Sequence, residues 1–123
     1  AYLAELQEML VIEDKKIDLL ATHFIWTDIT GSTKGSPGNL KDFRDHIKLL
    51  RKKGCLVGVA GHAHLDGYAQ ISRKAFGMNY FRKAELIRRP QVIIVPAITR
   101  GKGRNGFLIL DTEQFTFEAI ALD

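Results

Sequence analysis

Two histidines separated by one residue, His62 and His64, follow an apolar run that begins at Leu56. In an extended segment the side chains of residues i and i+2 point to the same side, so both imidazoles can reach one ligand. Imidazole is largely neutral near pH 7 and offers a lone pair to Zn, Fe, Mn or Ni. The pattern predicts a strand over about residues 55–60 that stops at Gly61 and carries a metal site at its carboxyl end.

A third histidine, His23, occurs in the same kind of context, at the end of the mainly apolar run that begins at Ile17. A single His-x-His is more often a pair of exposed turn residues than a metal site. Two apolar runs that each end in histidine are harder to explain in that way. We therefore expect His23, His62 and His64 to converge at one edge of a sheet and to hold metal ions. His46, which lies among charged residues of a predicted helix, is interpreted as a surface histidine outside the site.

The elements that would position these histidines follow from hydrophobic periodicity. Helical spacing predicts amphipathic helices over residues 2–12 and 39–53. The apolar run before His23 predicts a strand over residues 17–23. After His64, alternation predicts two short antiparallel strands near residues 68–73 and 76–81, followed by a buried strand over residues 91–98. Asn105-Gly106 predicts a hairpin turn, and residues 112–114 predict a second turn before a strand at 115–120.

These residues resemble a known family. Gly61-His62-Ala63-His64 is similar to the Gly-His-x-His signature of the calcineurin-like metallophosphoesterases, and Ala21-Thr22-His23 is similar to the strand-end histidine that precedes it there. Residues 92–96 and 106–111 resemble the closing strands of the family. The resemblance covers nearly the whole chain and corresponds to the second half of the family pattern. It implies an α/β fold, a mixed β-sheet sandwich with flanking helices, as half of a four-layer α/β/β/α architecture.

The resemblance also implies a chemistry, the hydrolysis of phosphomono- or phosphodiesters at two divalent metal ions (Mn, Fe, Zn or Ni). His23 and His62 would match ligands of one ion and His64 a ligand of the other. From the sequence itself, Arg100 and Arg104 are candidates to clamp a substrate phosphate, and Trp26 is a candidate wall of the substrate site. Asp66 is either a partner that orients a histidine or simple turn chemistry.

The Asp-x-His, Gly-Asp and Gly-Asn-His motifs, which supply the remaining ligands in the family, do not occur in this sequence. We therefore expect the chain alone to be feeble or inactive. A missing N-terminal half would complete the enzyme.

Composition sets broader bounds. The 123 residues are 46% hydrophobic, which suffices for one domain over residues 1–123 with a real core. The single cysteine, Cys55, cannot form an internal disulfide, which favours a reducing, cytoplasmic compartment. No apolar stretch approaches the roughly 20 residues of a membrane span. The net charge of +4 suits phosphate-bearing substrates and makes nucleic acid a possible partner. The basic clusters near Arg51, Arg73, Arg82 and Arg88 are interpreted as mostly solvated.

Two alternatives remain open. The segment Asp28-Ile29-Thr30-Gly31-Ser32-Thr33 resembles the opening metal-binding segment of class III nucleotide cyclases, with Asp66 as the only candidate for the second carboxylate. Otherwise, the chain is a non-catalytic domain that binds nucleic acid or a protein through its basic strands, using exposed aromatic residues such as Tyr80 and Phe81.

Overall fold

A computed structural model describes residues 9–14, 16–23, 40–98 and 104–122, with the side chains of residues 40–42 and 62–64 left out. In this part of the chain there are nine strands and one helix. In chain order they are β1 (Met9–Ile12), β2 (Leu19–Thr22), α1 (Leu40–Lys52), β3 (Val57–Leu65), β4 (Tyr68–Ser72), β5 (Phe76–Asn79), β6 (Lys83–Glu85), β7 (Gln91–Pro96), β8 (Gly106–Asp111) and β9 (Thr116–Ala121).

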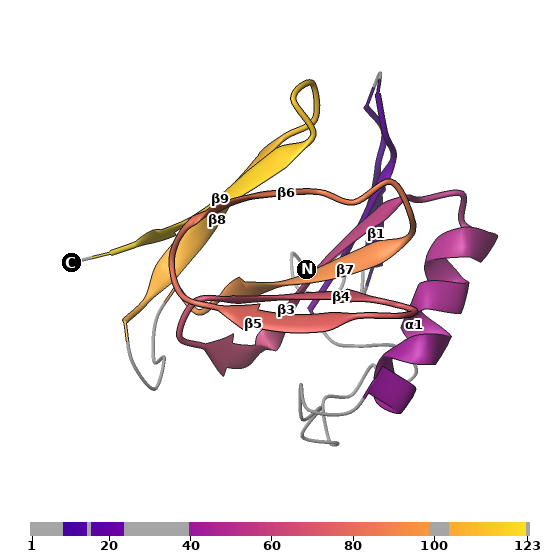
Figure 1. Cartoon of the computed structure of the whole chain (residues 1–123). Helices are drawn as coiled ribbons and strands as arrows, with labels where there is room; N and C mark the ends of the chain where they lie inside the picture. Colours follow the sequence, from indigo (N-terminus) through magenta and orange to yellow (C-terminus); the bar gives the residue numbers. More distant parts are fainter. Residues whose placement is uncertain (1–8, 15, 24–39, 99–103, 123) are drawn as a thin grey trace, which may run out of the picture.

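The expected fold class is wrong. The described residues are mostly β and form two sheets with a single helix, instead of a half of a four-layer α/β/β/α architecture. The larger sheet has six strands in the order β1-β2-β3-β7-β4-β5, and the smaller has three in the order β6-β9-β8. Figure 1 shows α1 on one side of the larger sheet and β8 and β9 on the other.

The first predicted helix accounts for part of this error. Residues 9–12, the described end of the helix predicted over residues 2–12, form strand β1, which pairs with β2 in antiparallel fashion. Met-Leu-Val-Ile is a short, continuous apolar run, and periodicity alone cannot separate a strand from a helix in such a run. Its β-branched residues and its pairing with Leu19–Thr22 favour the strand. Residues 2–8 lie outside the described part of the chain.

Other predicted elements are confirmed. Helix α1 matches the helix predicted over residues 39–53, and β2 falls within the strand predicted over 17–23. Strands β4 and β5 form the predicted antiparallel pair. The turn after Asp111 joins β8 to β9, with Asp111 Oδ1 accepting the backbone N–H groups of Glu113 and Gln114. By contrast, β7 and β8 belong to different sheets, so they do not form the two-stranded hairpin expected around Asn105-Gly106.

The centre of the larger sheet is buried on both faces. Strands β2, β3 and β7 run parallel, with Leu19 opposite Val57 and Val57 opposite Gln91. Alternate residues serve two separate cores, as expected for apolar strands covered on both sides. Leu20, Ala60 and Val92 pack with α1 through Phe43, Ile47 and Leu50. Leu19, Val57 and Ile93 pack with the smaller sheet through Phe117 and Ala119.

The turn between β3 and β4 depends on Gly67. Its φ angle is +111°, and a Cβ atom added there would meet the backbone carbonyl oxygen of Asn79. Only glycine fits such a close approach at a positive φ. This turn sends the chain from β3 past β7, so that β4 pairs with the far side of β7.

In the part of the chain that the structure describes, the single helix α1 is not long and apolar enough to cross a membrane.

Candidate metal site

His23 lies at the carboxyl end of β2, beside the neighbouring strand β3. Thr22 is opposite Ala60 in the parallel register, so the next residues along each strand are His23 and Gly61. A Cβ atom built on Gly61 would lie 3.4 Å from Nδ1 of His23 and 3.9 Å from its Cε1. His23 is exposed overall. Its imidazole therefore rests against the backbone of β3, next to the residue that precedes His62, with part of it accessible.

His62 and His64 lie in the last part of β3. The expectation that the strand ends at Gly61 is wrong, because β3 continues to Leu65. Its pairing with β7 is regular up to Ala60 and shifts in register before Leu65, which is opposite Pro96. The irregular register explains the error, since a glycine inside a strand often marks such an irregularity as well as an end. Both histidines still fall near the carboxyl edge of the parallel strands.

The structure describes the side chain of His23 but not those of His62 and His64. Among the side chains that it describes, no three metal-ligating groups gather at one point. The convergence of the three imidazoles thus stays a prediction. What the described residues establish is that the strand carrying His23 and the strand carrying the His-x-His pair are parallel neighbours in register.

Of the candidate substrate-binding residues, the structure describes only Arg104. Trp26 and Arg100 lie outside the described residues. Arg104 is exposed just before β8, and its backbone N–H donates to Oδ1 of Asp66 at 3.1 Å. Asp66 follows His64 by two residues, so this bond fastens the segment around Arg104 to the end of β3. Asp66 thus links the β3–β4 turn to the segment before β8. Its role in orienting a histidine stays a prediction.

His46 is not a surface histidine, and this prediction is wrong. Its side chain is 0% exposed, and its Nε2 would lie 3.5 Å from a Cβ atom on Gly58. The buried face of α1 contains Phe43, His46, Ile47 and Leu50, at helical spacing. The charged neighbours Arg44, Asp45 and Lys48 suggested exposure, but Gly58 leaves room for the ring. Burial lowers the pKa of His46 from 6.5 to about 4.

His46 is also separate from the candidate site, as expected. Gly58 precedes Gly61 by three residues, which is about 10 Å along a strand. His46 lies on the buried face of α1, beside Gly58, whereas His23 lies at the end of β2, beside Gly61.

Cys55 is a small buried side chain, as predicted. Burial raises the pKa of its thiol, the carboxylate of Asp18 raises it further, and the ammonium group of Lys53 opposes both. A raised pKa leaves little thiolate at neutral pH, so Cys55 is a poor nucleophile.

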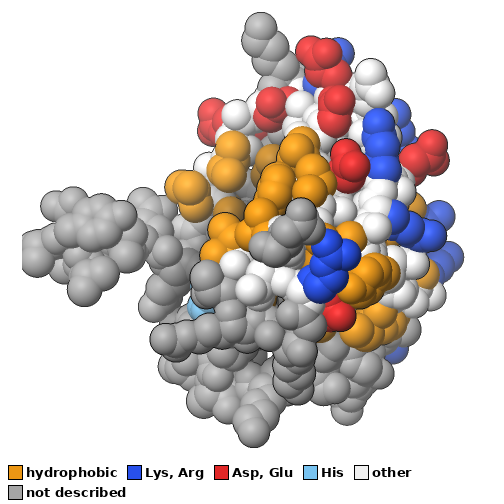
Figure 2. Space-filling model, turned by 90° about the vertical axis from the view of Figure 1, so that its left-hand side faces the viewer, with side chains coloured by type: hydrophobic (Ala, Val, Ile, Leu, Met, Phe, Trp, Pro, Cys, Tyr) orange, Lys and Arg blue, Asp and Glu red, His pale blue; other side chains and the backbone are white. Residues whose placement is uncertain are grey.

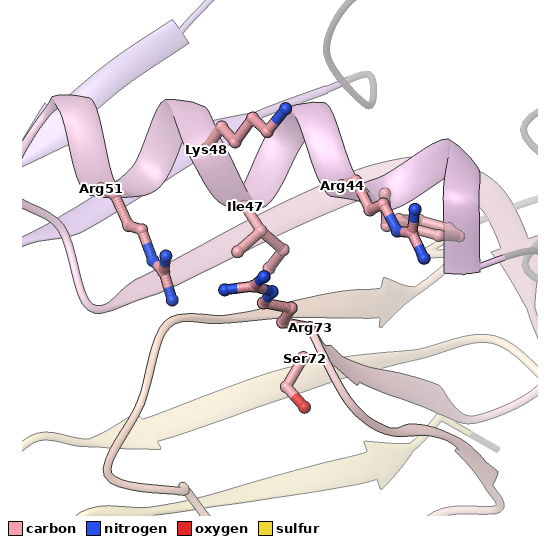
Figure 3. A pocket seen from close by; sticks show the side chains of 7 residues that line it. Arg44, Ile47, Lys48, Arg51, Ser72 and Arg73 are labelled. Carbon is pink, nitrogen blue, oxygen red and sulfur yellow. The ribbon is translucent and has the colours of Figure 1, made fainter.

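The fold also forms a basic cleft that the charge clusters in the sequence did not predict. A cavity of about 390 Å³ lies between α1 and the turn that joins β4 to β5. Its lining residues are Phe43, Arg44, Ile47, Lys48, Arg51, Ser72 and Arg73. Figure 3 shows cationic side chains from both walls bordering this space. Arg51 and Arg73 lie in clusters interpreted as solvated, and only the fold shows that they face one another.

The residues behind the two alternatives give little support to either. Asp28 and the rest of the cyclase-like segment lie outside the described residues, and Asp66 is engaged with the backbone of Arg104. Tyr80 is exposed, but its ring packs edge to face on Phe81 at 5.1 Å between centroids. Because the two rings pack against each other, less of their surface is open to a ligand.

The outer face of the smaller sheet carries apolar side chains. Phe107 and Ile109 of β8 are exposed, as is Leu122 after β9. Figure 2, which views the side on which β8 and β9 lie, shows apolar side chains gathered near the centre of this face, with acidic side chains mainly above them. Strand β1, at the edge of the larger sheet, exposes Leu10, Val11 and Ile12.

The chain matches no family model, and comparisons with curated proteins and with solved structures also give no match.

Proposed function

We propose that the chain contributes histidine ligands to a dinuclear metal site that hydrolyses phosphomono- or phosphodiesters. The ligands are His23, His62 and His64. The observation that carries the proposal is the contact of the His23 ring with Gly61, the residue directly before His62. Two parallel strands in register bring the separate histidine motifs of the sequence to one edge of the sheet.

The residues at this edge suit a borderline transition metal. Gly61 has no Cβ, so the imidazole of His23 can approach β3 closely while staying exposed. Imidazole donors favour Mn, Fe, Zn or Ni over Mg or Ca. When bound, two such ions would supply an activated hydroxide and neutralise charge on the phosphoryl oxygens.

The chain's own side chains have two tasks in this proposal. The three imidazoles bind the metal ions and fix their position at the edge of the sheet. Arg104, held near the end of β3 through Asp66, attracts the phosphate of the substrate. The net charge of +4 assists the approach of an anionic ester.

The proposal also requires a completing half with oxygen ligands, because the sequence lacks the motifs that would supply them. Two features of the surface are compatible with such a partner. Strands β1 and β8 are both edge strands, and both expose apolar side chains. Open apolar edges of this kind are usually covered by further chain.

The test is hydrolysis of p-nitrophenyl phosphate and bis(p-nitrophenyl) phosphate by protein that carries the completing motifs, with added Mn²⁺. We expect His62→Ala to reduce kcat/KM by at least about 100-fold, since a metal ligand is lost, while the thermal midpoint changes little. Lys83→Ala, an exposed position on β6, is the control and should retain full activity. Full activity of His62→Ala at limiting Mn²⁺ would refute the proposal.

A further inference from the structure

We propose that the cleft between α1 and the β4–β5 turn binds consecutive phosphate groups of a linear polyanion, such as the backbone of a single-stranded nucleic acid. This site is separate from the candidate metal site. It rests on the four cations Arg44, Lys48, Arg51 and Arg73, which all line one cavity of about 390 Å³.

The helical wall of the cleft presents three cations in a row. Arg44, Lys48 and Arg51 are spaced i, i+4 and i+7, so they lie on one face of α1. Seven residues of helix extend over about 10 Å. Figure 3 shows the three side chains spread along the helix, with Arg44 and Arg51 at either end. A row of this length can contact more than one phosphate of a chain.

The opposite wall is a tight and well-fastened turn. The backbone N–H of Ser72 donates to the carbonyl oxygen of Ala75, and the N–H of Ala75 donates to Oγ of Ser72. Ser72 is itself buried. Arg73 is therefore carried on a short turn with little freedom, and Figure 3 shows its guanidinium group below Ile47, facing α1.

The described residues that line the cleft carry four positive charges and no negative charge to offset them. All four cations are exposed, and none of the described residues that line the cavity is acidic. Like charges at i and i+4 on a helix destabilise it by a few tenths of a kcal/mol. Such an arrangement costs stability in the absence of a ligand, and an anion in the cleft relieves the repulsion.

The chemistry of the lining selects phosphate. The planar guanidinium groups of three arginines can each form paired hydrogen bonds with phosphate oxygens. Phe43, the one aromatic residue among the described lining residues, is 1% exposed and packs into the core, so it offers no ring to a base. Recognition should therefore depend on the phosphate chain and tolerate any base sequence.

The sheet register separates the cleft from the histidines. Ser72 is opposite Gln91, which is opposite Val57 at the start of β3. His23 instead lies beside Gly61, four residues further along β3, which is about 13 Å in an extended strand. A polyanion in the cleft is thus a second ligand, whose binding does not require metal.

The test is fluorescence anisotropy of a 5′-labelled 20-nucleotide oligo-dT with the 123-residue chain, in EDTA. We expect binding whose log–log salt slope is about −2 to −3, as four phosphate contacts on a single strand predict. Arg51→Glu with Arg73→Glu should weaken binding at least tenfold. Lys83→Glu with Arg89→Glu makes the same change in net charge at exposed positions outside the cleft lining and should weaken it less than threefold.

Competition identifies the source of the phosphates. Inorganic tripolyphosphate should displace the oligonucleotide, and orthophosphate at equal phosphate concentration should not. If tripolyphosphate binds but the oligonucleotide does not, the cleft binds phosphate chains of small ligands, and nucleic acid is ruled out as the source.

Equal weakening of binding by both double variants would show that only net charge matters and would overturn the proposal. So would the failure of both probes, the oligonucleotide and tripolyphosphate, to bind at 50 mM salt. Circular dichroism confirms that each variant is folded, and the single variant Lys48→Glu should also weaken binding.

Discussion

The imidazole of His23 lies against the backbone of Gly61, at 3.4 Å from its Nδ1 to the position that a Cβ atom would occupy. This contact joins the end of β2 to the middle of β3, two parallel strands that are separated in the sequence by a helix. The candidate metal site depends on it, because the next residue of β3 is His62.

Gly61→Val should disturb this contact and weaken metal binding. The branched side chain would occupy the space beside the His23 ring and displace the imidazole from β3. We expect Mn²⁺ affinity, measured by titration calorimetry, to fall by about tenfold or more, as for other changes that misorient a ligand. Gly77→Val is the matched control, since a Cβ atom there has no neighbour closer than 3.7 Å. Equal affinities for both variants would show that the position of His23 is irrelevant to metal.

Burial of His46 should make the protein less stable in acid. Its folded pKa of about 4 is lower than the value of about 6.5 expected when unfolded, so the unfolded chain binds the proton more readily. The stability from neutral His46 is present above pH 6.5 and is lost as the pH falls towards 4. The total loss is roughly 3 kcal/mol, because each pH unit between the two pKa values costs about 1.36 kcal/mol.

Urea denaturation of the wild type and of His46→Gln across pH 4–7 measures this effect. The variant should show a smaller loss of unfolding free energy on acidification, because glutamine does not titrate. If His46→Gln and the wild type lose stability in parallel, His46 is not the buried group that senses pH.

His46→Ala should also be costly at neutral pH, contrary to what a solvated position would give. It removes a fully buried ring that lies beside Gly58, and a cavity at such a position costs on the order of 2–4 kcal/mol. The unfolding free energy at pH 7 measures this cost. A change below about 0.5 kcal/mol would mean that the side chain is solvated after all.

Gly67→Ala should be far more destabilising than Gly54→Ala. Both glycines have positive φ, but a Cβ atom on Gly67 would collide with the backbone of Asn79 and Tyr80, while one on Gly54 meets nothing within 4 Å. Gly54→Ala should cost about 1 kcal/mol from its φ angle alone, and Gly67→Ala several kcal/mol more. Thermal unfolding of the two variants gives the comparison, and similar midpoints would contradict the tight packing of the β3–β4 turn.

The local pattern of the sequence predicts many of the elements but not their arrangement. The heptad-like apolar face of α1 and the alternation in β4 and β5 are strong signals, and both elements form near their predicted limits. Met9–Ile12 forms a strand because β2 offers it an edge, which is a tertiary effect. The order of strands in the sheet likewise depends on the turn at Gly67. The residues of this turn do not indicate that β4 will pair with β7.

The sites were predictable to different degrees. The proximity of His23 to Gly61 follows from two apolar runs that end in histidine and pair in parallel. The burial of His46 could not be predicted from α1 alone, because it depends on the missing side chain of Gly58 in another strand. The basic cleft depends on the fold in the same way, since Arg73 and Arg51 line one cavity only when the β4–β5 turn lies beside α1.

The most direct test of the central claim is a calorimetric titration of Mn²⁺ and Zn²⁺ into the chain and into its single variants His23→Ala, His62→Ala and His64→Ala. Because all three imidazoles are proposed as ligands, each variant should bind at least one of these metals at least tenfold more weakly than the wild type, while His46→Gln should bind normally. Unchanged affinity in His62→Ala or in His23→Ala would contradict the proposed site.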